Sequence, residues 1–135
     1  MTIQKWDSAF SHFTPEELKC PESGGYAFHP GFAERLEQLR VMYNKPIHVN
    51  SCCRSKAHNA KLAGSSDHSL HVYDAPNRGA QGTCAVDVRV SDNIDRHEFL
   101  KIALALGFSA YFIKGNPVNI HIDQRLLLGE PAIVW

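Results

Sequence analysis

The sequence predicts an α+β fold, in which a small antiparallel or mixed sheet has helices packed on one face. Two segments show the periodicity of amphipathic helices, and three short segments alternate apolar and polar residues. Helices and strands do not alternate regularly along the chain, which argues against a parallel sheet built from βαβ units. The chain has 135 residues without an internal repeat or a linker, so one domain spanning residues 1–135 is expected.

Four segments are predicted to be helices. The first begins at Thr14-Pro15-Glu16-Glu17, which reads as a capping box with proline at the first helical position. The second carries an apolar stripe at i, i+4, i+7 and i+11 and ends at Asn44. Ser55 caps a third helix that extends to about Ala63, and a fourth runs from about Asn93 to Leu106. The stripe consists of Phe32, Leu36, Leu39 and Tyr43.

Four segments are predicted to be strands, namely residues 47–50, 84–90, 109–113 and 118–123, with a long loop at 65–83. Side chains on a strand point alternately to its two faces. If the valines beside Asp87 pack against the helices, Asp87 points to the opposite face. His121, between two isoleucines, then shares that face, and His48 can join them.

The composition argues against several kinds of protein. The formal net charge is zero, which argues against a nucleic-acid binder. No stretch is apolar enough to span a membrane, and residues 1–7 lack the apolar core of a secretion signal, so cytoplasmic synthesis without a signal peptide is expected. No pair of cysteines has C-x-x-C spacing, which favours free, buried thiols. The cysteines are Cys20, Cys52, Cys53 and Cys84.

The eight histidines are many for this length, and His68 and His71 lie in the loop before the Asp87 strand. Two imidazoles and a carboxylate on a rigid sheet can form a zinc site, here on the face opposite the helices, with a fourth position open to water. Zinc lowers the pKa of such a water from about 15.7 to about 7. Alternatively, His68 and His71 are ligands at i, i+3 on a helix, or each histidine is an ordinary surface or core residue.

Short motifs follow one another in a fixed order along residues 13–135. They are Asn50-Ser51-Cys52-Cys53-Arg54-Ser55, His58-Asn59, Gly64, Ser69-Leu70-His71, Gly82 with Ala85-Val86-Asp87-Val88, and Ile120-His121-Ile122-Asp123. In this order the chain resembles the zinc peptidase family that includes D-Ala-D-Ala carboxypeptidases and phage endolysin peptidases. That family shares its fold with the Hedgehog signalling domain.

The resemblance implies a role for each matching residue. His71, Asp87 and His121 would bind Zn²⁺, and Arg54 would bind substrate and stabilise the oxyanion. Ser69 would bind substrate or brace its loop. The implied activity is hydrolysis of an amide bond in peptidoglycan peptides. A monomer is expected. A phage lysis or virion-associated enzyme, released to the cell wall, fits this activity.

The sequence departs from the family pattern beside the site. His71 and Asp87 are sixteen positions apart, so residues 72–81 look like an insertion. Cys52 and Cys53 stand where many relatives have glycine and an aromatic residue. Cys84, close to Asp87, could bind zinc but is interpreted as a structural thiol.

The general base is the third departure, because Val118 stands where many relatives carry a carboxylate. Asp123 could be the base or could orient an imidazole, and the second role is preferred. His48, also a candidate for substrate binding, and Asp74 are further candidates. The alternative functions are non-catalytic metal binding, cell-wall binding by a virion component, and a thiol enzyme using Cys53.

Overall fold

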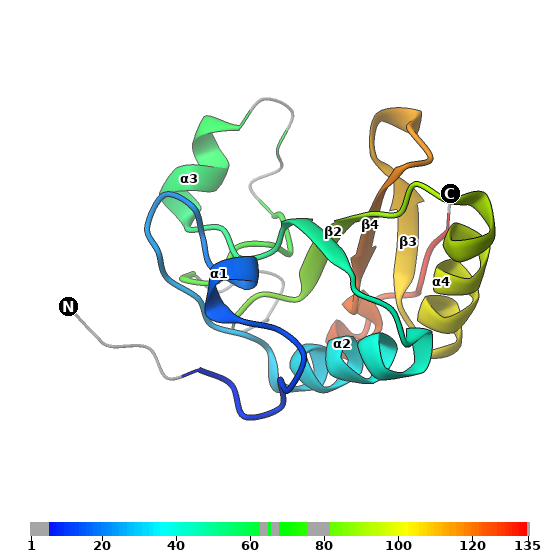
Figure 1. Ribbon diagram of the computed structural model, residues 1–135. Helices are drawn as coiled ribbons and strands as arrows, with labels where there is room; N and C mark the ends of the chain where they lie inside the picture. The colour runs from blue at the N-terminus through cyan, green and yellow to red at the C-terminus, as the bar shows by residue number, and fades with distance from the viewer. Residues whose placement is uncertain (1–5, 63–64, 66–67, 76–81, 135) are drawn as a thin grey trace.

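The computed structural model describes residues 6–62, 65, 68–75 and 82–134. A four-stranded sheet lies at its centre (Figure 1), and its strands pair in the order β1-β2-β4-β3. All three pairings are antiparallel, so the α+β prediction is confirmed in its antiparallel form. The strands are β1 (His48–Ser51), β2 (Ala85–Arg89), β3 (Ser109–Phe112) and β4 (Asn119–Asp123).

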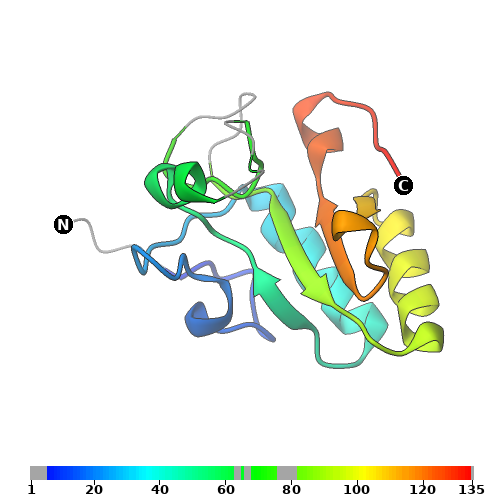
Figure 2. The same ribbon diagram turned by 90° about the horizontal axis from the view of Figure 1, so that it is seen from above.

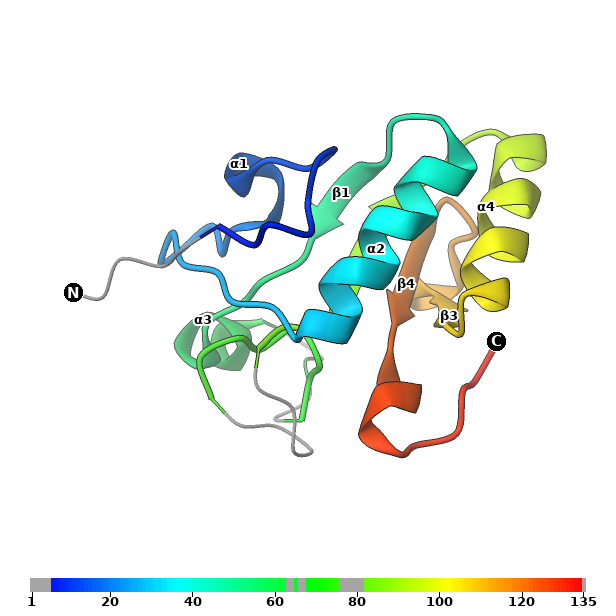
Figure 3. The same ribbon diagram turned by 90° about the horizontal axis from the view of Figure 1, so that it is seen from below.

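The helices are α1 (Pro15–Leu18), α2 (Pro30–Tyr43), α3 (Lys56–Lys61) and α4 (Asn93–Ala105). Two 3₁₀ turns follow, η1 (Ile113–Gly115) and η2 (Arg125–Leu128). Helix α2 crosses one face of the sheet with α4 beside it (Figure 3), and the view from the other side shows the strands in front of α2 (Figure 2). In the described ranges, no helix is both long and apolar enough to cross a bilayer.

The helix ends follow local chemistry. The capping box of Thr14 and Glu17 is present, and Asn44 ends α2 in the left-handed conformation, with φ 57°. The third helix is shorter than predicted, because the backbone of Leu62 is extended and α3 ends at Lys61. The predicted end at Ala63 lies outside the described residues.

The alternation of faces predicted for the strands is confirmed. The residues of the apolar stripe on α2 are buried, as are Val86, Val88, Ile120 and Ile122 in the core under the helices. Asp87 pairs directly with His121 across β2 and β4, so both side chains lie on the opposite face. The hydrophobic core therefore determines which side chains are presented on the face away from the helices.

Strand β1 contains a bulge that the sequence did not indicate. Val49 pairs with Val88, but Ser51 rather than Asn50 pairs with Asp87, so one extra residue is accommodated. The strand starts at His48, one residue later than predicted. The bulge changes the register of the chain that follows, and it brings Ser51 level with Asp87.

Candidate metal centre

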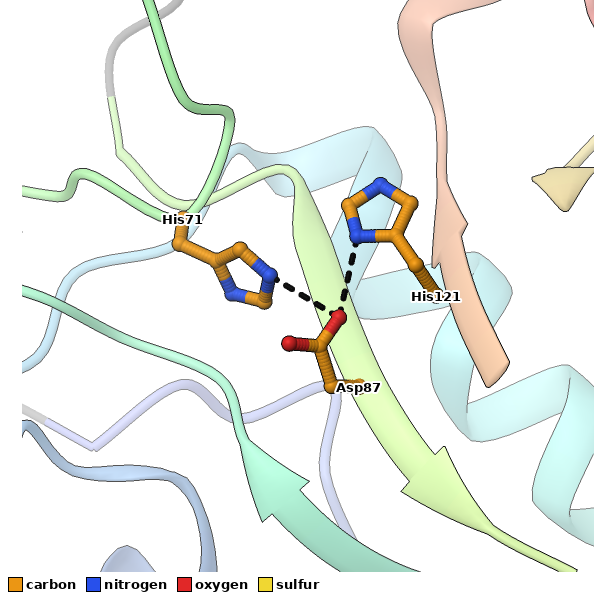
Figure 4. A group of neighbouring side chains, drawn as sticks. All are labelled: His71, Asp87 and His121. Carbon is orange, nitrogen blue, oxygen red and sulfur yellow. Dashed lines mark hydrogen bonds and ion pairs between the residues drawn. The ribbon is translucent and has the colours of Figure 1, made fainter. Parts of the chain in front are cut away.

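Three side chains converge on the face of the sheet away from the helices (Figure 4). His71 Nε2 lies 3.1 Å from Asp87 Oδ1, and His121 Nδ1 lies 2.9 Å from the same oxygen. All three residues are buried, and one ligand atom from each lies within 4.8 Å of the others. The structure thus brings together the three residues that the family resemblance singles out as zinc ligands.

His71 is held by the loop that precedes β2. Its carbonyl oxygen accepts hydrogen bonds from the backbone of Arg54 and from the hydroxyl of Thr83, both at 2.9 Å. On the ring, Nδ1 lies 2.7 Å from the carbonyl oxygen of Cys52. Since a carbonyl only accepts, Nδ1 carries the hydrogen, and the Nε2 lone pair faces Asp87.

His121 is oriented by a chain of charged groups. Its Nε2 lies 2.7 Å from Asp123 Oδ2, and Arg125 donates to both oxygens of Asp123, at 2.9 and 2.7 Å. Burial would raise the pKa of Asp123, but the hydrogen bonds from Arg125 and His121 lower it to about 2. Asp123 is therefore an ionised acceptor, so Nε2 of His121 donates to it and Nδ1 faces Asp87. The ring of Tyr111 stacks on His121 with centroids 4.4 Å apart.

The donor set fits a divalent metal ion. With neutral rings, two imidazole lone pairs and the carboxylate of Asp87 face one another with no hydrogen between them. Burial lowers the pKa of His71, which favours its neutral ring. Burial opposes a proton on His121, but Asp123 and Asp87 raise its pKa, so a metal would displace that proton. Tetrahedral bonds of about 2.0–2.2 Å place ligand atoms about 3.3–3.6 Å apart, somewhat farther than the 3.1 and 2.9 Å found, so a small outward movement would admit the ion.

Arg54 contacts Asp87 rather than standing free. Its Nη2 lies 3.2 Å from Asp87 Oδ2, while its other nitrogens donate to Ser51 and Asn59. Arg54 thus binds one carboxylate oxygen and leaves the other to face the imidazoles. Burial would raise the pKa of Asp87, but the two imidazoles hold it well below its usual range.

A cavity of about 740 Å³ opens beside the cluster. Ser69 lines it and also accepts a hydrogen bond from the backbone of His71, so a bracing contact is present. The described residues that line it are Arg54, Leu62, Ser65, His68, Ser69, Leu70, His71, Asp87, Tyr111, Ile113, Lys114, His121, Asp123 and Arg125.

Other predicted residues do not come to this cavity. His48 shares the face but pairs with Arg89 farther along the sheet, and it is exposed. Asp74 is exposed and accepts a hydrogen bond from the backbone of Lys56. Val118 is half-buried and does not line the cavity. Of the proposed insertion, residues 76–81 lie outside the described residues.

The four cysteines lie in the hydrophobic core. All four are free and buried, as predicted. Burial and the charge of Asp123 raise the pKa of Cys84 to about 12, and its sulfur lies near the carbonyl oxygen of Gln124. Cys84 therefore stays protonated and outside the group of His71, Asp87 and His121.

Among the cavity residues that the sequence did not indicate are Tyr111, Lys114 and Arg125. Arg125 lies after the end of β4, in η2, so strand alternation does not predict its contact with Asp123. Tyr111 faces His121 only because β3 pairs with β4, which the sequence does not state. Lys114 lies in the turn between these strands, and no local signal marks it as a cavity residue.

The sheet thus carries a buried group of two imidazoles and one carboxylate that could hold a metal ion. A model of the family described as peptidase M15 matches residues 11–123, and the chain therefore belongs to the peptidase M15 family. No curated protein and no solved structure matches the chain. The family resemblance is thereby confirmed, while the carboxypeptidase or endolysin type stays a prediction.

The lowered pKa of Asp123 predicts a pH-dependent contribution to stability. The group titrates at about 2 when folded and at about 3.9 when unfolded, so its contribution is present above about pH 4 and is lost as the pH falls through about 2. In metal-free protein at neutral pH, Asp123→Asn should lower the free energy of unfolding by about 2–3 kcal/mol. Urea denaturation across this pH range should show the difference from the parent shrinking as the pH falls.

Glu98→Gln is the matched control, because Glu98 is exposed on α4. It removes the same charge and should show no such pH-dependent gap. A gap for Asp123→Asn that stays constant or widens in acid would contradict the ionised, Arg125-paired state of Asp123.

Proposed function

We propose that this protein is a zinc-dependent peptidase that hydrolyses an amide bond in peptidoglycan peptides, with His71, Asp87 and His121 as the ligands. The observation that carries the proposal is that two imidazole nitrogens and the carboxylate of Asp87 face one another beside a cavity. When bound, zinc supplies a water of lowered pKa and polarises the scissile carbonyl. Membership of the peptidase M15 family supports the choice of reaction.

Arg54 has donors left for the substrate. A guanidinium has five N–H groups, and three of them serve Ser51, Asn59 and Asp87. The two others donate to no described residue, and in this proposal they bind a peptide in the cavity that Arg54 lines. Arg54 therefore both positions Asp87 and stabilises the negative charge that develops on the carbonyl oxygen during hydrolysis.

Asp123 orients His121 and does not act as the base. Both of its oxygens accept hydrogen bonds from Arg125, and the side chain is fully buried. His68 is better placed to take a proton, because it lines the cavity and is exposed to solvent. In this proposal His68 takes the role of the carboxylate that many relatives carry at the position of Val118. Ser69 braces the loop that carries His71.

The cavity suits a short peptide. Its volume of about 740 Å³ lies within the usual range for sites that bind small ligands. Membership of the peptidase M15 family supports peptidoglycan stem peptides as the substrate. A phage lysis or virion-associated enzyme is the setting that we propose for this activity. The apolar Val118 favours a second candidate function, which is metal-dependent binding of cell-wall peptides without hydrolysis.

The activity assay uses peptidoglycan stem peptides and zinc-loaded protein. Hydrolysis should stop when a chelator removes the metal and should return when zinc is restored, because the reactive water depends on the metal. His121→Ala should lower both bound zinc and the rate by at least about 100-fold. Zinc binding without hydrolysis of any stem peptide would favour the second candidate function instead.

His68→Gln tests the proton acceptor. Its kcat should fall about 100-fold while bound zinc per chain stays unchanged, because His68 is not a ligand in this proposal. The control is His97→Gln, which alters an exposed histidine on α4 and should leave kcat unchanged. If His68→Gln kept the parent's kcat and pH profile, another group would be the base.

A further inference from the structure

Lys114 holds an unusual backbone conformation in the turn between β3 and β4, the orange loop of Figure 1. The turn is closed by a hydrogen bond of 3.0 Å from Asn116 N to the carbonyl oxygen of Ile113. Lys114 has φ 54° and ψ 29°, and Gly115 follows with φ 69°. Two left-handed residues in succession define a type I′ turn, whose first central position favours asparagine, aspartate or glycine.

Lysine is therefore a locally unfavourable choice at a position where asparagine would stabilise the turn. A residue kept in a disfavoured conformation beside a functional cavity points to a role for its side chain. Lys114 lines the same cavity as the cluster of His71, Asp87 and His121.

The charges that line the cavity leave the Lys114 ammonium available. Arg54 is paired with Asp87, and Arg125 is paired with Asp123. Asp87 and Asp123 are the carboxylates among the described residues of the cavity lining, while Lys114 is exposed and forms no ion pair with a described residue. A metal ion adds further positive charge, so the cavity favours an anionic ligand.

We propose that Lys114 determines specificity by binding a carboxylate of the peptide substrate, at the side of the cavity formed by the β3–β4 turn. The proposal rests on the proposed peptidase function and names the charge that its substrate carries. The carboxylate can be the C-terminus of the peptide or an acidic side group, since an ammonium binds both by the same charge-assisted hydrogen bond.

The experiment compares three forms of one stem pentapeptide with zinc-loaded protein. One form has both the terminal and the glutamyl carboxylate free, one has the terminal carboxylate amidated, and one has the glutamyl carboxylate amidated. KM and kcat are measured where the peptide is hydrolysed, and the dissociation constant is measured by calorimetry where it is not. The form for which the effect of Lys114 disappears identifies the carboxylate that is bound.

Lys114→Gln should raise KM for the free pentapeptide about tenfold and leave kcat within about twofold, as expected for losing one hydrogen bond to a charged group. Lys114→Arg should restore KM to within about threefold of the parent. Lys114→Asn should weaken binding as Lys114→Gln does, with an equal or higher Tm, because asparagine suits the turn. Lys101→Gln, on the exposed side of α4, is the charge-matched control and should change nothing.

The outcomes separate this inference from the proposed function. If the peptides are hydrolysed with a KM that Lys114→Gln leaves unchanged or changes equally for all three, the role of Lys114 is overturned. That result leaves the peptidase function in place. Binding that depends on Lys114 without hydrolysis supports the role of Lys114 and overturns the peptidase. If the peptides are not hydrolysed and their binding does not depend on Lys114, both the role of Lys114 and the peptidase function are overturned.

Discussion

Strands β2 and β4 pair so that Asp87 lies directly opposite His121, and the rest of the site is arranged around that pair. Directly opposed side chains have Cβ atoms about 4.5–5.5 Å apart, close enough to share one ion. A slip of one residue would turn Asp87 toward the helices and a valine toward the cavity. The apolar packing of the neighbouring valines and isoleucines under α2 therefore fixes the geometry of the polar cluster as well.

Each member of the cluster is held by a contact behind it. The carbonyl oxygen of Cys52 orients His71, Arg54 holds the second oxygen of Asp87, and the Asp123–Arg125 pair orients His121. Partners of this kind determine which ring nitrogen is free to bind a metal. They also keep buried charges paired, which matters because an unpaired charge in this environment is strongly destabilising.

Sequence reasoning succeeded where a repeating pattern carried the information. Alternation along the strands placed Asp87, His121 and Asp123 on one face. The order of the motifs identified His71 as a candidate ligand although it lies in an irregular loop. Sequence reasoning was less successful for residues whose position depends on which strands pair and in what register. The same alternation put His48 on the correct face but could not show that it lies opposite Arg89, away from the cavity. The bulge in β1 and the approach of Lys114 to the cavity also depend on pairing between distant segments.

Different partners occupy Nδ1 of His71 and Nε2 of His121, so opposite ring nitrogens of the two histidines would bind a shared ion. Nitrogen NMR of histidine-labelled protein, recorded before and after addition of one equivalent of zinc, tests this most directly. Zinc should shift the resonances of Nε2 of His71 and Nδ1 of His121, while Nδ1 of His71 and Nε2 of His121 keep their hydrogens. Zinc bound through the same nitrogen in both rings, or no response from either ring, would contradict this arrangement.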